Sequence, residues 1–424
     1  MRKSQGMDKG EEMLTRLRGL VSATFRTVIV TATALGCNVQ ANSNDVGAVE
    51  VPRMTPAECQ PGLAADSRTA LWWDSAARIL GGMDVPESAP IVGRKSAAAH
   101  RSQMNTLWTR FNAKRLQPIR EFAQRELANG PGPTTAPVFY PFSGPDAAYA
   151  LAFFPAAADL IFTGLEPVGE VVDLDAMDDP TLAASLEQLR GSLRSILALS
   201  FFVTMEMDAD LRRNKLSGVT PILILFLARH GYTVNDVDHV VLNPDGRLCR
   251  SDANRVRDVR STDERIPGVI VRFQAVGDPR ERRIIYFKTD LSNDGLQKHP
   301  QYLKFVESVN PPTTIIKSAS YLLHLKEFTT LRDHILRHSQ AVLQDDTGVP
   351  IKLYRAVQWE RRLYGAYVGP IPIFQARFQP EMANAYRETA QPLGFGIGYQ
   401  HESHESNLQL FFRRSDKVIT TLPE

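Results

Sequence analysis

The first part of the chain carries apolar residues at helical spacing. Leu71, Trp72 and Leu80 lie on one face of residues 70–80, and an apolar face also repeats over residues 103–127. A segment rich in Gly and Pro follows at 129–133, and neither residue type continues a helix well. The pattern therefore predicts a helical N-terminal section that ends at about residue 130.

The pattern then changes to short apolar runs separated by turns. Residues 136–142 form one run, 143–146 a turn, 147–154 an apolar segment compatible with a helix, and 159–163 a second run. A strand, a helix and a second strand in this order form a βαβ unit, in which the two strands are parallel.

Helix and strand patterns alternate over the rest of the chain. Helices are predicted within 181–230, at 302–309 and at 321–338. Strands are predicted at 238–242, 268–275, 283–289, 313–318 and 341–344, with further candidates at 371–378, 394–399 and 408–413. The turn at 277–279 joins two of them as an antiparallel hairpin. We therefore expect an α/β fold with a mostly parallel, mixed sheet flanked by helices, a helical N-terminal part and an antiparallel hairpin insertion.

An apolar run at residues 27–36 follows three arginines and ends in small residues. It is shorter than the roughly 20 apolar residues of a membrane-spanning helix and is typical of a secretory signal peptide. Residues 34–37 resemble the lipobox of bacterial lipoproteins, which implies lipidation of Cys37. The alternatives are cleavage after Ala41 and a short buried helix in a cytoplasmic protein. We expect a signal peptide at 1–37 (with Met13 as an alternative start), a polar tether at 38–62, and one large domain at 63–424.

Charge and cysteine content narrow the classes of partner. The formal net charge is +2, and without the first 36 residues it is −1, from 43 Lys and Arg against 44 Asp and Glu. A near-neutral protein has no overall attraction for nucleic acid. We therefore expect no nucleic-acid partner, and membrane contact only through the signal peptide or a lipid anchor. Cys59 and Cys249 can form a disulfide in an oxidising compartment, with two buried thiols as the alternative. No motif identifies a cofactor.

Four segments read FYPFSGPD (139–146), GLEPVG (164–169), IKSASYLLH (316–324) and QDDTGVP (344–350). Together they resemble a group of bacterial proteins, many of them exported, for which no activity is established. The resemblance extends from about residue 139 to the C-terminus. It implies a fold and assigns no catalytic residue.

Polar residues follow the apolar strand candidates at five points of the chain. Ligands of open α/β sheets bind outside the carboxyl ends of the strands, so parallel strands would gather these residues at one edge as a polar crevice. The residues expected there are Ser143, Asp146, Glu166, Asp290, Lys317, Ser318, Ser320, Asp345, Asp346 and Thr347. His324 lies four residues after Ser320, so the two would share one face of a helix. Each residue taken alone fits a turn or a helix cap equally well.

Asp146, Lys317, Ser320 and Asp346 are the catalytic candidates, and the other residues of this set, with His324, are candidates for ligand binding. A lysine beside serines can act as a nucleophile and base pair. Carboxylates can instead act as acid and base, or hold a divalent metal. We expect an exported cell-envelope protein with a small-molecule ligand and a hydrolase as the candidate activity.

Two alternatives stay open. A non-catalytic ligand-binding lipoprotein would pack aromatic residues near the ligand, and the candidates are Phe139, Tyr140, Phe142 and Tyr149. A cytoplasmic Rossmann-like protein would place Glu166 on a ribose. Its turn has one glycine, Gly144, followed by Pro145, and such a turn fits phosphate poorly.

Other motifs favour ordinary structure. Phe and Ile interleave the glycines of 394–398, which favours a strand over a dinucleotide-binding loop. His334 and His338 lack the intervening Glu of a zinc-binding HExxH motif, which favours a solvated helix face, and 401–405 is expected to be an exposed loop. No GxSxG or Walker A motif is present, which argues against a standard α/β-hydrolase or a P-loop NTPase.

Overall fold

The computed structural model describes residues 68–89, 95–128, 135–171, 173–199, 216, 218–252, 256, 259, 263–309 and 311–414. The contacts divide the chain into two units, Pro52–Gly369 with Gln379–Glu424, and Met1–Val51 with Pro370–Phe378. The expected signal peptide, Cys37, Cys59 and the tether lie outside the described residues. In the smaller unit, Pro372–Arg377 form a 3-10 helix instead of the expected strand, since proline has no N–H to donate to a sheet.

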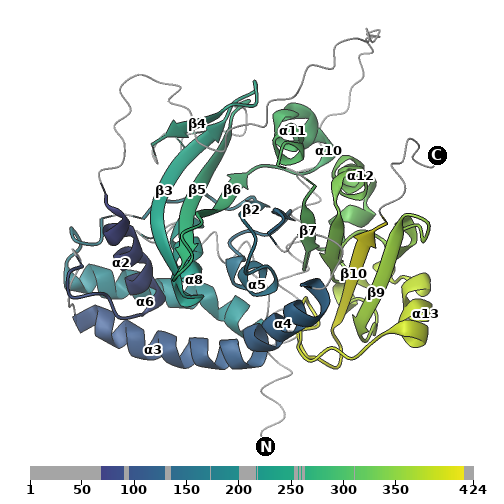
Figure 1. Ribbon diagram of the computed structural model, residues 1–424, viewed down its shortest axis with the longest axis horizontal. Coiled ribbons are helices and arrows are strands. Elements are labelled where there is room, and N and C mark those ends of the chain that lie inside the picture. The colour runs from purple at the N-terminus through teal and green to yellow at the C-terminus, as the bar shows by residue number, and fades with distance from the viewer. Residues whose placement is uncertain are drawn as a thin grey trace, which may run out of the picture. The chain divides into compact units, whose positions relative to one another are not determined.

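The larger unit is built on a ten-stranded mixed sheet with the order β4-β3-β5-β6-β2-β1-β7-β8-β10-β9 (Figure 1). The strands are β1 Val138–Tyr140, β2 Asp159–Gly164, β3 Tyr232–Leu242, β4 Leu248–Ser251, β5 Ile266–Ala275, β6 Arg282–Lys288, β7 Thr313–Ile316, β8 Ala341–Gln344, β9 Trp359–Gly365 and β10 Asn407–Arg413. The five central strands, from β6 to β8, are parallel, and the strands on both sides of them are antiparallel. The α/β class is confirmed, with fewer parallel pairings than expected (four against five antiparallel).

Both faces of the central parallel strands are covered. Every residue of β1 and β8 is buried, as the continuous apolar runs of their sequences require. Two apolar clusters cover the two faces. One contains Val138 and Tyr140 of β1, and the other contains Phe139 between them.

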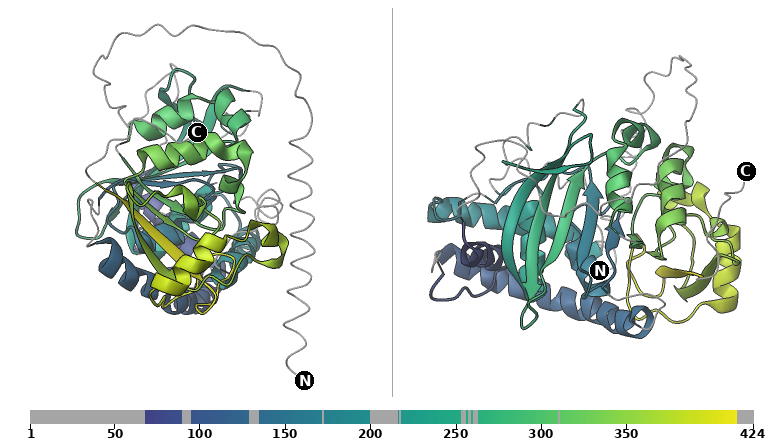
Figure 2. Two further views of the ribbon diagram at one scale, coloured as in Figure 1. Left: turned by 90° about the vertical axis from the view of Figure 1, so that its right-hand side faces the viewer. Right: turned by 45° about the horizontal axis from the view of Figure 1, so that its top comes forward.

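The first cluster packs beneath the helices of the N-terminal half. These are α2 Ala70–Gly81, α3 Lys95–Phe111, α4 Gln117–Phe122, α5 Ala147–Phe153, α6 Asp179–Leu199 and α8 Thr220–Arg229. The second cluster packs beneath helices of the C-terminal half, which are α10 Asn293–Lys298, α11 Gln301–Glu307, α12 Thr329–His338 and α13 Pro380–Thr389. Figures 1 and 2 show the purple-to-teal helices on one side of the sheet and the green helices on the other.

The order of the strands reverses at β1. From β1 the chain continues through α5, on the first face, to β2. The strand on the other side of β1 is β7, which is followed by α12, on the second face, and β8. The loops after β1 and β7 therefore leave the sheet toward opposite faces. Ligands of doubly wound sheets bind at such a reversal.

Two further local expectations were wrong. Residues 321–338 are not one helix, because 3-10 turns at Leu322–His324 and Lys326–Phe328 precede α12. Residues 394–399 form bends and no strand, and Gly398 has a positive φ of 77°. Strands β4 and β9 and helices α10 and α13 were not predicted from the sequence.

Candidate functional site

The five polar segments expected at one edge of the sheet follow β1, β2, β6, β7 and β8 in the structure. These are the five central parallel strands, so their carboxyl ends share one edge. We call this edge, with the loops that follow β1, β2, β6, β7 and β8, the carboxyl edge. Its centre is the strand-order reversal between β1 and β7.

A buried ion pair lies at this centre. Lys317 Nζ is 2.8 Å from Asp146 Oδ2 and 4.2 Å from the ring centroid of Tyr149. The Tyr140 hydroxyl donates a hydrogen bond of 2.7 Å to the same Asp146 oxygen. Asp146 is the residue before α5, but its side chain makes no capping hydrogen bond and turns to the lysine instead. Burial raises the pKa of Asp146, while the Lys317 ammonium and the Tyr140 hydroxyl oppose the shift.

The loop after β8 places a second carboxylate beside this pair. Asp345 Oδ2 accepts the backbone N–H of Ser318 at 2.8 Å, and Asp345 Oδ1 accepts the N–H of Thr347 at 3.0 Å. Thr347 Oγ1 accepts the N–H of Ala319 at 2.7 Å. Burial raises the pKa of Asp345, and bonds from Thr347 and Ser318 oppose the shift. A Cβ on Gly398 would lie 2.6 Å from Asp345 Oδ2, so only glycine fits there.

The neighbouring Asp346 is also buried. The Tyr321 hydroxyl donates to its Oδ2, and Asn407 Nδ2 donates to its Oδ1 at 3.1 Å. Burial and the adjacent Asp345 carboxylate raise the pKa of Asp346 to about 7. A carboxyl group that titrates near neutral pH can exchange a proton with a bound molecule.

Backbone strain concentrates at the same place. The non-glycine residues with positive φ in the described part of the chain are Phe142, Ser318, Ser320 and Tyr321, with φ between 50° and 59°. Phe142 follows β1, and the other three follow β7. Side chains with a Cβ rarely adopt this conformation, and such residues cluster at functional sites.

Several buried polar atoms at this edge have no hydrogen-bond partner. They are Asp146 Oδ1, Thr289 Oγ1, Ser318 Oγ and Asn407 Oδ1. The backbone N–H of Tyr149 lowers the pKa of Asp146, but no hydrogen bond of normal geometry reaches Oδ1. Buried polar groups are normally paired, so a cluster of unpaired ones marks a place where another molecule can supply partners.

Ser318, Ser320, His324 and Tyr399 are partly exposed and form the outer part of the site. Tyr399 donates a hydrogen bond of 2.9 Å to Ser318 O, and Ser320 Oγ lies 2.7 Å from the Tyr399 hydroxyl. Because Tyr399 has one proton, Ser320 is the donor of the second bond. Ser320 and His324 do not share a helix face as expected, since the backbone between them turns through left-handed Tyr321.

The remaining expected residues are Ser143, Glu166 and Asp290, of which the first two are buried. Ser143 bridges the loop after β1 to Thr163 of β2, with Oγ accepting the Thr163 N–H at 3.0 Å. Glu166 is buried beside Tyr286, whose hydroxyl donates to Glu166 O at 2.8 Å. Asp290 is exposed and accepts bonds from the N–H and hydroxyl of Ser292, the residue that caps α10. These hydrogen bonds stabilise the loops that follow β1, β2 and β6.

The geometry of the carboxyl edge bears on metal binding and on a lysine–serine pair. The aspartates of the carboxyl edge do not form a group of three metal-ligating atoms within 4.8 Å, as judged over the described residues. Lys317 pairs with the carboxylate of Asp146, and Ser320 hydrogen-bonds with Tyr399.

Sequence reasoning missed Tyr321, Tyr399 and Asn407. Asn407 begins β10, which runs antiparallel to β8, so its start reaches the edge where β8 ends. A rule that considers only residues after strands overlooks such a residue. The serine-rich loop with an aromatic residue after β7 was the available signal for Tyr321.

The chain has no match among protein-family models, among curated proteins or among solved structures at a significant level.

Proposed function

We propose that this chain is an exported cell-envelope protein that binds a small polar ligand at the carboxyl edge, between the loops after β1 and β7. The observation that carries the proposal is the coincidence of strained backbone and buried, incompletely paired polar groups at the strand-order reversal. Strained residues persist only where the surrounding structure holds them, and function is the usual reason.

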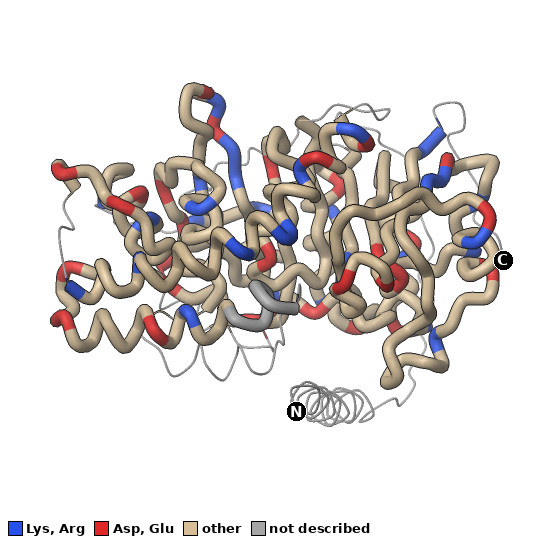
Figure 3. The backbone as a smooth tube through the Cα atoms, turned by 90° about the horizontal axis from the view of Figure 1, so that it is seen from below, with Lys and Arg blue, Asp and Glu red and all other residues tan. Residues whose placement is uncertain are grey.

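Charge indicates the class of ligand. Three buried aspartates, Asp146, Asp345 and Asp346, lie at the carboxyl edge, where Lys317 pairs with Asp146 and opposes the raised pKa of Asp345. An anionic ligand would add like charge to a buried acidic cluster at a high cost. The ligand class is therefore neutral or cationic, with hydroxyl or amine donors for carboxylate, serine and tyrosine oxygens. Acids and bases are interspersed along the described elements, as Figure 3 shows.

Two features support export. The signal-like run at 27–36 is one. The other is Cys249 of β4, which is disulfide-bonded, as is usual for proteins of oxidising compartments. Among the described residues, no helix is both long and apolar enough to cross a membrane.

The Rossmann-like alternative is less favoured by the same geometry. In that class a phosphate occupies the N-terminus of the helix after the first strand. Here that position holds the buried carboxyl group of Asp146, which would oppose a phosphate.

Hydrolysis is the second candidate function, and the raised pKa of Asp346 favours it. Asp346→Asn should then abolish product release from chromogenic glycosides or esters while ligand binding persists. Loss of binding and turnover together would assign Asp346 to binding alone.

A thermal-shift screen of the full-length protein tests the proposal. We would compare neutral polyols and sugars, amines, and organic anions as probes. Ser320→Ala and Tyr399→Phe should remove the stabilisation given by a neutral or cationic probe, because both side chains are partly exposed and lie at the site. Ser102→Ala, at an exposed position of α3, is the matched control and should keep it. Stabilisation by anions alone, or equal responses of all variants, would refute the proposal.

A further inference from the structure

Three metal-ligating side chains meet at a place that the candidate site does not include. Glu307 is the last residue of α11, and His334 and His338 lie one turn apart on α12. They are the group of three His, Cys, Asp or Glu side chains in the described residues whose ligand atoms all lie within 4.8 Å of one another. His334 is buried and not solvated as expected from the sequence, while Glu307 is exposed and His338 is partly so.

The distances match the edges of a coordination sphere. His334 Nδ1 is 3.3 Å and His338 Nε2 is 3.4 Å from the same oxygen, Glu307 Oε1. Ligands at about 2.0–2.1 Å from a tetrahedral zinc ion lie roughly 3.3 Å from one another. Both contacts are longer than the usual range of about 2.7–3.2 Å for an N–H···O hydrogen bond.

Ring contacts keep the two histidines close together. The two imidazole rings stack with their centroids 4.7 Å apart. The ring of His334 also packs against the ring of Phe139 of β1, edge to face, with a distance of 6.2 Å between the ring centroids. The buried His334 is fixed by the core, and the exposed side of the cluster leaves a path for an ion to enter. A fixed, partly open set of two imidazoles and one carboxylate is a known zinc-binding set.

We propose that Glu307, His334 and His338 bind one divalent cation of the zinc type, with water at the remaining position. Imidazole nitrogen with a single carboxylate suits Zn²⁺, and also Co²⁺, better than Ca²⁺ or Mg²⁺. Helices α11 and α12 end shortly before β7 and β8 begin. The cluster therefore lies toward the amino ends of these strands, away from the carboxyl edge. The ion would clamp α11 to α12, and the proposal does not depend on the proposed function.

Titration of the untagged, full-length protein with Co²⁺ tests this inference, with Zn²⁺ as competitor. The wild type should bind one equivalent, with the visible absorption of tetrahedral Co²⁺, and Zn²⁺ should displace it and raise the unfolding temperature. His338→Ala should weaken binding at least tenfold. Glu307→Gln should weaken Co²⁺ binding as well. Because Glu307 is exposed and glutamine has nearly the same shape, this variant should fold normally even if His338→Ala does not.

His404→Ala is the control, because His404 is an exposed histidine in the 401–405 loop. It should leave the affinity unchanged. Loss of binding in His404→Ala with retention in His338→Ala would move the metal to that loop and overturn the proposal. Absence of Co²⁺ binding by the wild type would overturn it too.

Discussion

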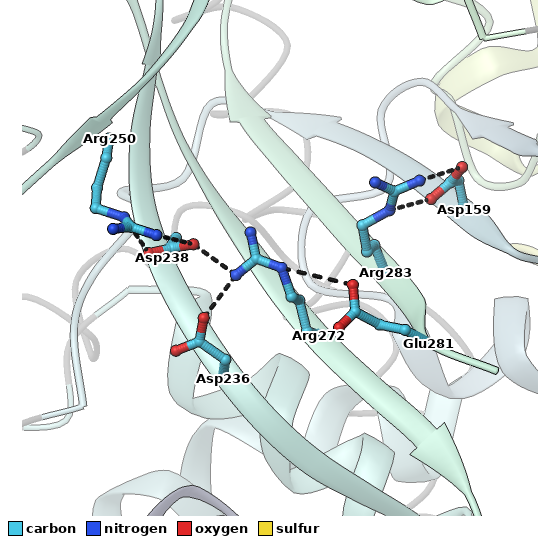
Figure 4. A network of polar contacts seen from close by, with 7 residues as sticks. All are labelled: Asp159, Asp236, Asp238, Arg250, Arg272, Glu281 and Arg283. Carbon is cyan, nitrogen blue, oxygen red and sulfur yellow. Dashed lines mark hydrogen bonds and ion pairs between the residues drawn. The ribbon is translucent and has the colours of Figure 1, made fainter. Parts of the chain in front are cut away.

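The carboxyl edge and the antiparallel strands β3–β5 both concentrate charge, but they use it differently. In the antiparallel part, Arg272 Nη1 lies 2.6 Å from Asp236 and 2.5 Å from Asp238, and Arg250 lies 2.8 Å from Asp238 (Figure 4). Figure 4 also shows Glu281, whose Oε1 lies 3.7 Å from Arg272 Nε, and a separate pair, Arg283 of β6 and Asp159 of β2, on parallel strands.

The carboxyl edge has a larger excess of acidic over basic side chains. Lys317 pairs with the buried Asp146, and two further buried aspartates follow β8. These side chains come from loops after strands, and the loops after β1 and β7 contain residues with positive φ. On the antiparallel strands, Arg250 of β4 and Arg272 of β5 each have a carboxylate of β3 across a strand boundary, which stabilises pairing between strands. The comparison indicates that charged residues at regular strand positions stabilise the fold. At the carboxyl edge, charge is held at a cost in stability, as expected of a binding site.

The largest effect is expected from breaking the buried pair. Lys317→Met should lower the free energy of unfolding by about 3–5 kcal/mol, because it leaves Asp146 buried without its partner. Urea denaturation measures this loss. The double variant Lys317→Met with Asp146→Asn removes both charges and should recover most of the stability. A loss below about 1 kcal/mol in the single variant would mean that the pair is not buried as described.

The next effect is a dependence on pH. Burial raises the pKa of Asp346 to about 7 from its ordinary value near 3.8. Between these pH values the unfolded chain releases the proton and the folded chain keeps it, so stability falls as pH rises from about 4 to about 7. Asp346→Asn removes this contribution. Its stability relative to wild type should therefore rise over that window, by a few kcal/mol at most. Urea denaturation at several pH values measures the difference, and a constant difference would refute the assignment.

A smaller loss is expected in the antiparallel part. Arg272→Met should cost about 1–2 kcal/mol, since Asp238 keeps Arg250 and Asp236 is partly exposed. The loss should shrink in high salt, because partly exposed pairs are screened. Probe binding at the carboxyl edge should not change. The distinction between the two regions would be wrong if Arg272→Met lost as much stability as Lys317→Met, or if it reduced probe binding at the carboxyl edge.

The smallest effect has the opposite sign. Ser318 has a φ of 53° and an unpaired hydroxyl, so Ser318→Gly should stabilise the fold by up to about 1 kcal/mol. Ser308→Gly is the matched control, because Ser308 has a φ of −69° and should lose about 0.5–1 kcal/mol on substitution. Thermal denaturation measures both. Destabilisation by Ser318→Gly would show that the positive φ of Ser318 does not cost stability.

The central strands could be predicted from the sequence because their signals are local. Apolar runs bounded by Gly and Pro turns locate β1, β2, β7 and β8, and parallel strands bring the residues that follow them to one edge. That reasoning placed Asp146 and Lys317 together, although it could not show that they pair. Pairing depends on side-chain direction and burial, which follow from contacts between distant parts of the chain.

The rest of the site depends on tertiary structure that no local pattern reports. The left-handed conformation of Tyr321 ends what the sequence presents as one helix, and only the packed structure shows it. Asn407 reaches the site through an antiparallel strand, and the burial of His334 depends on α12 packing against β1. Sequence periodicity describes one helix or strand at a time, whereas these features depend on contacts between two elements.

A crystal structure of the full-length protein soaked with a panel of small sugars, polyols and amines tests the central claim most directly. We expect density for a bound molecule between the loops after β1 and β7, in contact with Ser318, Ser320 or Tyr399. Probes bound only at other places, or no bound probe at the carboxyl edge at millimolar concentration, would contradict the account.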